Sequence, residues 1–280
     1  MKCYLDFEIT LTWIFVQCKY YSLIRLNVFK LTPSTIIDKF NRGIIKGLVN
    51  EVTMKQTLKT NINVIQETIE NHLPAGNEEP TVVAVTKTVD EKTMRDLHAL
   101  GVKHFGENRP DVFLKKYENL ADINDEIQWH FIGNLQTRQV KKIINDIDYL
   151  HSLDRLSLAK EIQKRAEQPV NCFIQVNVSG EDSKSGFQPD ALADTLKELE
   201  AYDKLNIIGL MTMAPIDASQ EEIHEYFRFL KELQVEVEQS NFTNAPCTEV
   251  SMGMSQDYPI AVSEGATFIR VGTAFFKDAL

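Results

Sequence analysis

The feature that most restricts how this chain can fold is a regular alternation of short apolar runs with longer amphipathic stretches, which continues from residue 81 almost to residue 280. The apolar runs are rich in β-branched and aromatic residues, as is typical of strands that are buried on both faces of a parallel sheet. The stretches between them have the spacing of helices that cover such a sheet. The eight runs are TVVAVT, HFGEN, IQWHFIG, YLHSLD, NCFIQVNV, LNIIGLMTM, TEVSMGM and TFIRVGTAFF.

Eight repeats of strand and helix predict an α/β protein built as a single (β/α)8 barrel, also called a TIM barrel. An open, doubly wound sheet is the alternative, but no G-x-G-x-x-G sequence follows any of the expected strands. An N-terminal helix is expected before the first strand. It would begin at Met54, because apolar residues recur with helical spacing at Leu58, Ile62, Val64, Ile65 and Ile69. The barrel domain is therefore predicted to span residues 54–280.

Residues 1–53 differ from the rest of the chain, because residues 1–40 are crowded with aromatic residues and follow neither a clean helical nor a clean strand period. Their apolar run ITLTWIFV is shorter than the roughly 20 residues that a membrane-spanning helix needs. Asp6 and Glu8 interrupt any apolar core of a signal peptide. We interpret this segment as a non-native or disordered extension, translated from upstream of a natural start at Met54. A genuine extension that associates with a membrane or a partner is the alternative.

Composition narrows the classes of partner. A chain of 280 residues that is 43% hydrophobic and 25% charged can bury one sizeable core. Its net charge of -10 argues against nucleic acid or anionic membrane as the main partner, since both are bound through surfaces rich in Lys and Arg.

The four cysteines form no C-x-x-C pair and the six histidines show no H-x-x-x-H spacing, so no metal site is expected. Reduced thiols are typical of a cytoplasmic protein.

Barrel active sites are assembled at the C-terminal ends of the strands, and those ends carry a consistent set of groups here. Lys87 directly follows the first run, where an amine can form a Schiff base or bind phosphate. Many barrels bind phosphate after strands 7 and 8, and SQD at residues 255–257 could cap a short helix in YPIAVSEG. Arg270 remains protonated and would point into the same mouth. The residues suited to holding phosphate are Ser251, Gly253, Ser255, Gly272 and Thr273.

An amine, a phosphate cradle and a fixed cation together indicate pyridoxal 5'-phosphate (PLP), with its aldehyde on Lys87 and its ring nitrogen toward Arg270. The motifs AVTKT, FGEN, WHFIGNLQTRQVK, VNVSGEDSKSG, GLMTM, SMGMSQD and IRVGTAFF, in this order, resemble the pyridoxal phosphate homeostasis protein family over about residues 54–280. The resemblance implies a barrel similar to the N-terminal domain of alanine racemase, with PLP bound covalently on Lys87. It places Asn108 near the ring and brings His130, Asn177 and Met211 as further cofactor contacts.

The same resemblance implies a monomer that buffers PLP and delivers it to apoenzymes, with little or no catalysis. A PLP-dependent racemase is the first alternative. Racemisation needs acid/base groups on both faces of the substrate, and Lys87 can serve only one. Alanine racemase takes the other from a tyrosine of a second domain, whereas the expected eighth strand is followed directly by KDAL. Arg270 would also leave the ring nitrogen unprotonated, which weakens the cofactor as an electron sink. A cofactor-free Schiff-base aldolase that uses Lys87 is the second alternative.

Overall fold

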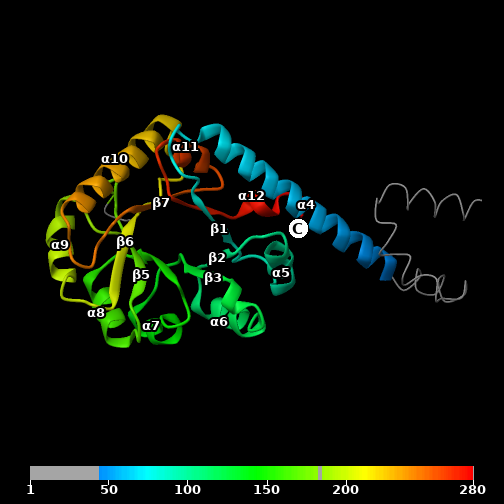
Figure 1. Ribbon diagram of the computed structural model, residues 1–280, viewed down its shortest axis with the longest axis horizontal. Coiled ribbons are helices and arrows are strands. Elements are labelled where there is room, and N and C mark those ends of the chain that lie inside the picture. The colour runs from blue at the N-terminus through cyan, green and yellow to red at the C-terminus, as the bar shows by residue number, and fades with distance from the viewer. Residues whose placement is uncertain (1–43, 182–184, 280) are drawn as a thin grey trace, which may run out of the picture. The chain divides into compact units, whose positions relative to one another are not determined.

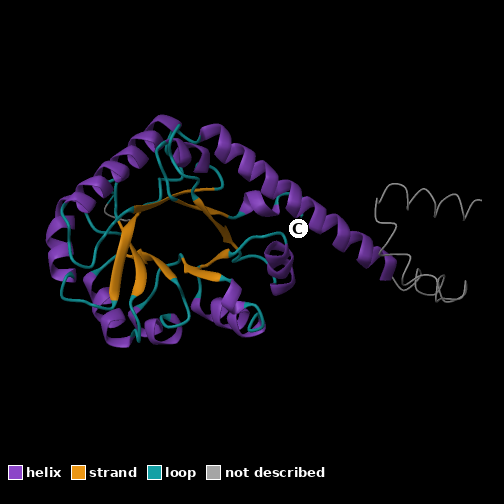
Figure 2. Cartoon of the chain, viewed as in Figure 1, coloured by secondary structure: helices purple, strands orange, loops and turns teal. Residues whose placement is uncertain are grey.

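The architecture is a closed barrel of parallel strands. The computed structural model describes residues 44–181 and 185–279, with side chains described from residue 53 onward. The strands are hydrogen-bonded in chain order from β1 to β8, and β8 pairs with β1 to close the ring. Figure 2 shows the strands as a ring enclosed by helices, so the predicted (β/α)8 barrel is confirmed. The strands are β1 (Thr81–Val85), β2 (His104–Glu107), β3 (Gln128–Phe131), β4 (Tyr149–Leu153), β5 (Val170–Gln175), β6 (Leu205–Met211), β7 (Glu249–Met254) and β8 (Phe268–Val271).

Helices follow the strands around the outside of the ring (Figure 1). Within the described residues, no helix is both long enough and apolar enough to cross a membrane. The helices are α4 (Ile44–His72), α5 (Glu91–Ala99), α6 (Pro110–Asn119), α7 (Thr137–Ile143), α8 (Leu156–Arg165), α9 (Leu192–Leu199), α10 (Gln220–Gln239), α11 (Tyr258–Ser263) and α12 (Thr273–Phe276), with 3-10 turns η1 (Asn124–Glu126) and η2 (Pro189–Ala191).

Helix α4 confirms the expected N-terminal helix but corrects its start. It begins at Ile44, upstream of Met54, so the helix includes residues 44–53, which the prediction left outside the domain. Its residues Leu58 and Ile69 are fully buried in the main core. The side chain of Asn61 donates hydrogen bonds of 2.8 Å to the carbonyls of Phe275 and Lys277. The interpretation of residues 1–53 as a non-native extension concerns mostly residues 1–43, which lie outside the described residues.

Apolar side chains fill two regions of the barrel. The larger core lies between the strands and the helices, and it contains Trp129, which is 1% exposed. Inside the ring, a smaller cluster joins Val83, Phe173, Met211 and Phe268. Alternation along a strand separates the two regions, because neighbouring side chains point to opposite faces of the sheet. The barrel interior is therefore packed beneath its C-terminal mouth and is no open channel.

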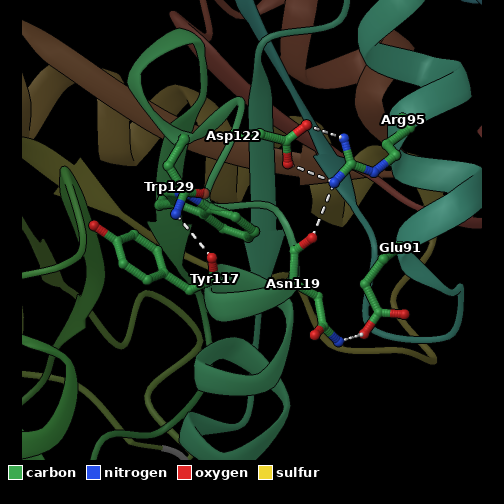
Figure 3. A network of polar contacts seen from close by, with 7 residues as sticks. Glu91, Arg95, Tyr117, Asn119, Asp122 and Trp129 are labelled. Carbon is green, nitrogen blue, oxygen red and sulfur yellow. Dashed lines mark hydrogen bonds and ion pairs between the residues drawn. The ribbon is translucent and has the colours of Figure 1, made fainter.

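Polar contacts also link neighbouring elements on the outside. Figure 3 shows Arg95 of α5, which pairs with Asp122 at 2.6 Å and donates to the carbonyl of Asn119 at 2.9 Å. The side chain of Asn119 in turn donates to Glu91 at 2.9 Å. The paired side chains of Arg95 and Asp122 are 41% and 63% exposed, so each contact stabilises the fold only modestly. This network joins α5 to the end of α6 and lies on the flank of the barrel.

The last two strand regions differ in detail from the expectation. The run TFIRVGTAFF was expected to be one strand, but β8 ends at Val271 and the helix α12 begins at Thr273. The chain turns at Gly272, where φ is -119° and ψ is -84°, which ends the strand geometry. The short helix expected within YPIAVSEG is present as α11. Its predicted cap is wrong, because the Asp257 carboxylate accepts the N–H of Met254 at 2.5 Å and no N–H of the helix.

Candidate functional site

The segment that carries Lys87 is fixed from outside the barrel. Lys87 lies in an exposed turn, two residues after β1. Behind it, the Nζ of Lys116 donates to the carbonyl of Thr86 and to Oε1 of Glu107, each at 2.7 Å. The hydroxyl of Thr86 donates to the same Glu107 oxygen at 2.6 Å. The Lys87 side chain itself has no hydrogen-bond or ion-pair partner within the part of the chain that the structure describes. The Lys87 amine therefore lies at the C-terminal mouth, on a turn whose backbone is held by Lys116.

Backbone donors converge on one oxygen at the ends of β7 and β8. The hydroxyl oxygen of Ser255 accepts the N–H of Gly272 at 2.9 Å and the N–H of Ala274 at 3.4 Å. A phosphate oxygen could accept the same donors, since backbone N–H groups are common phosphate ligands. A Cβ added to Gly272 would approach Val85 of β1 at 3.4 Å, so this cradle adjoins the strand that leads to Lys87. Thr273 lies between the two donors and is exposed.

Gly253 shapes the cradle through close packing. Its φ of +89° lies in the left-handed region, which residues other than glycine rarely adopt. A Cβ there would also lie 2.5 Å from the Cβ of Ala261 and 3.0 Å from the Cα of Tyr258, both in α11. The glycine therefore lets the end of β7 lie directly on α11. This contact sets the position of Ser255, two residues further on.

Arg270 of β8 is a buried cation held by neutral acceptors. Its Nη1 donates to the hydroxyl oxygen of Ser251 at 2.6 Å, and its Nη2 donates to the carbonyl of Thr212 at 3.0 Å. The side chain is only 4% exposed, and no carboxylate forms an ion pair with it among the described residues. Burial lowers the pKa of Arg270 to about 10, while the nearby Asp257 raises it, so the guanidinium is protonated near neutral pH. Its remaining N–H donors have no partner in the described part of the chain.

Three of the sequence-predicted residues lie inside the barrel. Ser251 is fully buried and bridges Arg270 to His151, with 2.8 Å between its Oγ and Nδ1 of the histidine. His130 is 1% exposed, and other histidines occupy both of its ring nitrogens. Met211 belongs to the apolar cluster of the interior. The structure therefore assigns these side chains to the floor beneath the mouth.

The two predicted asparagines organise the loops around the mouth. Asn108 follows β2 directly and is half-buried. Its carbonyl approaches Gly133 so closely that an added Cβ there would lie 2.1 Å away. Asn177 is buried, its amide donates to the carbonyl of Glu181 at 2.8 Å, and its Oδ1 accepts from Ser179 at 3.2 Å. Asn177 therefore holds the loop after β5 rather than presenting a free amide.

Sequence reasoning missed two features of this site. It did not select Lys116, and it gave Glu107 no role. It also did not relate His104 and His151 to His130, although the three lie in consecutive strands. The inward period of two could have revealed them, because each occupies an odd position of its strand. Across the described residues, no group of three or more His, Cys, Asp or Glu side chains could hold a metal ion.

The donors at the mouth suit one kind of ligand. A phosphate fits the N–H groups of Gly272 and Ala274, a carbonyl carbon fits the amine of Lys87, and an uncharged acceptor fits the spare donors of Arg270. These elements come from β1, β7 and β8, which are neighbours in the ring. A phosphorylated aromatic aldehyde with a ring nitrogen carries all three functions.

Fold and site together define a barrel of the alanine racemase type. Residues 55–279 match the family model for the alanine racemase N-terminal domain. The solved alanine racemase of Corynebacterium glutamicum aligns with a TM-score of 0.61 at 14% identity, over 79% of this chain and 60% of that chain. At that identity the likeness concerns the fold alone.

The chain belongs to the pyridoxal phosphate homeostasis protein family. It is 40% identical over 200 residues to the pyridoxal phosphate homeostasis protein of Aquifex aeolicus, covering 70% of this chain and 86% of that protein. The Synechocystis protein of the same name is 38% identical over 203 residues, with 71% and 91% covered. PipY of Synechococcus elongatus has been solved without PLP and with PLP bound, with TM-scores of 0.71 and 0.69. Each PipY chain is 31% identical, and 78% of this chain and 99% of PipY are covered.

Proposed function

We propose that this protein binds PLP, holds it covalently through a Schiff base on Lys87, and takes part in intracellular PLP homeostasis with little or no catalytic turnover. Membership of the pyridoxal phosphate homeostasis protein family and the PLP-bound structure of PipY support PLP as the ligand. The proposal includes a cytoplasmic monomer and delivery to PLP-dependent apoenzymes.

The observation that carries the proposal is the state of Arg270. A buried charge is costly unless it is paired or fully hydrogen-bonded. Arg270 is protonated and buried, yet only Ser251 and Thr212 accept from it among the described residues. Its spare donors call for one further acceptor from a ligand. The ring nitrogen of PLP is such an acceptor, and an unprotonated ring nitrogen fits a donor that keeps its own proton.

Other residues of the mouth would bind the aldehyde and the phosphate of PLP. When bound, PLP supplies an aldehyde that exchanges reversibly between amines. Lys87 provides an exposed amine for this exchange, and the Lys116–Glu107 pair fixes the turn on which it stands. The N–H groups of Gly272 and Ala274 would hold the phosphate. The hydroxyl of Ser255, which now accepts from both, would then be free to turn and donate.

The same geometry supports a carrier more than an enzyme. A guanidinium opposite the ring nitrogen withholds the proton that makes PLP a strong electron sink. Lys87 is a single amine, whereas racemisation needs acid/base groups on both faces of the substrate. We therefore expect exchange of PLP with other amines to be faster than any chemistry at the Cα of an amino acid.

An absorption spectrum of the purified protein tests the proposal. PLP added to the wild type is expected to give a near-visible band that is absent in Lys87→Ala. Lys142→Ala, which removes an exposed lysine of α7, is the matched control and should keep the band. A wild-type protein without any such band at saturating PLP would overturn the proposal.

The two alternative functions give different results in companion assays. A racemase would interconvert amino-acid enantiomers at ordinary enzyme rates, about 1 per second or faster. An aldolase would remain colourless, and borohydride would trap it only in the presence of a sugar or keto-acid substrate. Either result, with the loss of activity in Lys87→Ala, would replace the carrier role.

A further inference from the structure

The interior of the barrel contains a continuous chain of polar side chains. It runs from Arg270 to Ser251 at 2.6 Å and from Ser251 to Nδ1 of His151 at 2.8 Å. Nε2 of His151 lies 2.9 Å from Nδ1 of His130, and Nε2 of His130 lies 2.9 Å from Nδ1 of His104. We call these five residues the histidine relay. They come from β8, β7, β4, β3 and β2.

The relay crosses the barrel from one end toward the other. His104 is the first residue of β2 and is half-buried at the N-terminal end of the ring. Arg270 is the third residue of β8, near the C-terminal mouth. The four members other than His104 are each at most 4% exposed. Water is therefore not needed to complete any of the contacts between them.

Aromatic packing fixes the planes of the two central rings. His130 stacks on Tyr149 with 4.4 Å between ring centroids and an interplanar angle of 4°. His151 stacks on Phe173 with the same separation and an angle of 25°. Stacking contacts only the faces of the rings, so the nitrogens at the ring edges remain available for the hydrogen bonds of the relay. The rings are thus held in one orientation.

All three histidines are disposed to be neutral. Burial lowers the pKa of His130 and His151 well below the ordinary value. The positive charge of Arg270 lowers the pKa of His151 further, and each histidine opposes protonation of the next one in the relay, His104 that of His130 and His130 that of His151. The pKa of His104 is lowered as well, chiefly by burial and then by Lys103. A neutral imidazole has one N–H donor and one acceptor nitrogen. Each contact between two rings therefore needs a donor on one side and an acceptor on the other.

This requirement leaves only two consistent arrangements of protons. In the first, all three rings carry the proton on Nε2, and the Ser251 hydroxyl donates to Nδ1 of His151. In the second, all three carry it on Nδ1, so that Ser251 accepts from both Arg270 and His151. The hydroxyl hydrogen of Ser251 would then have no acceptor among the described residues, in a site that is fully buried. An unpaired buried donor is costly, so the first arrangement is favoured.

We propose that the histidine relay is a directional chain of hydrogen bonds, with all three histidines protonated on Nε2, that positions Arg270 and links it to the N-terminal end of the barrel. The role of the chain at the cofactor rests on the proposed PLP function, because Arg270 is the member that would contact the ring. Ser251, His151, His130 and His104 are positioning residues, since each acts on the ligand only through Arg270. Cooperative chains of this kind strengthen their own bonds in a low-dielectric interior.

Nitrogen-15 NMR of histidine-labelled protein without PLP tests the relay directly. His104, His130 and His151 should each show an unprotonated Nδ1 and a protonated Nε2, with His130 and His151 neutral throughout pH 6 to 8, roughly the range around the ordinary histidine pKa. Single substitutions assign the signals. Mixed tautomers, Nδ1-protonated rings or an imidazolium at His130 or His151 would overturn the inference.

Two variants at the far end separate a relay from simple packing. His104→Gln keeps an acceptor for the Nε2–H of His130, and it should leave the His130 tautomer unchanged. His104→Phe keeps a ring but removes the acceptor, and it should change the His130 signal. If His104→Gln alters the His130 tautomer and His104→Phe leaves it unchanged, the directional chain is wrong.

The holo protein provides a second readout. Ser251→Ala cuts the relay beside Arg270 and should weaken PLP binding by about tenfold, the loss expected for one charge-assisted hydrogen bond. It should also shift the near-visible band of bound PLP, which a purely structural role would leave in place. An unshifted band with unchanged affinity contradicts the relay. A wild-type protein that binds no PLP refutes the proposed function instead, and leaves the tautomer experiment intact.

Discussion

Replacement of Lys116 by Met should destabilise the protein strongly. The side chains of Lys116 and Glu107 are 5% and 0% exposed, and they form an ion pair of 2.7 Å. The substitution leaves a buried carboxylate with only the Thr86 hydroxyl as a partner, and its Oε2 already has none among the described residues. Removal of one partner of a buried pair costs about 3–5 kcal/mol. For a domain of this size, 1 kcal/mol shifts Tm by about 2–4 °C, so Tm should fall by roughly 6–20 °C.

Differential scanning calorimetry measures this loss, and Lys115→Met is the matched control. The side chain of Lys115 is 74% exposed and lies 3.7 Å from Glu91, so its loss should cost within about 0.5 kcal/mol. The double variant Glu107→Leu with Lys116→Met should recover most of the stability, because it leaves no buried charge without a partner. Equal Tm values for Lys116→Met and Lys115→Met would refute the reasoning. The Lys116 variant should also bind PLP more weakly, since Lys116 holds the carbonyl beside Lys87.

Three further outcomes follow from packing and burial. Gly253→Ala should lower the free energy of unfolding in urea by about 1–3 kcal/mol, because its Cβ would lie 2.5 Å from another carbon at a φ of +89°. Burial raises the pKa of the thiols of Cys172 and Cys247, the second to about 12, so peptide mapping after alkylation at pH 8 should find both unmodified in the folded protein. Because the pKa values of His130 and His151 are lowered on folding, the unfolded chain binds more protons below about pH 6.5. The urea midpoint should therefore fall as pH is lowered from 7.5 to 5.5, and a flat profile would contradict neutral buried rings.

The barrel could be predicted because its signal is local and repeated. Each apolar run identifies a strand by its own residues, and the number of runs determines the closed ring. The ends of the strands and helices were harder to predict from the sequence. The strand β8, for example, ends at a turn at Gly272, which a hydrogen bond to the distant Ser255 stabilises. The start of α4 was missed because the prediction took Met54 as the first residue of the domain, although the apolar residues of IIKGLVNEVT at residues 44–53 already recur with helical spacing.

The candidate site was predictable where it depends on strand order. Lys87, Ser255, Gly272 and Arg270 occupy the expected ends of β1, β7 and β8, which adjacency in the ring brings together. The direction in which each side chain points was harder to infer from the sequence. Ser251 was expected at the phosphate, but it bonds Arg270 and His151 inside the barrel.

The contacts that the sequence did not indicate join distant parts of the chain. The ion pair of Lys116 depends on how α6 packs against β2, which no local pattern specifies. The bond between His130 and His151 depends on the stagger between β3 and β4. Roles for His130, Asn177 and Met211 at the cofactor remain predictions that came with the resemblance.

The most direct test of the central claim is to locate the attachment of PLP. The protein would be saturated with PLP, reduced with borohydride to make the link permanent, digested and mapped by mass spectrometry. We expect one phosphopyridoxyl group on the peptide that contains Lys87, and none in Lys87→Ala treated in the same way. Recovery of the group on another lysine in both proteins, or on no lysine at all, would contradict the account.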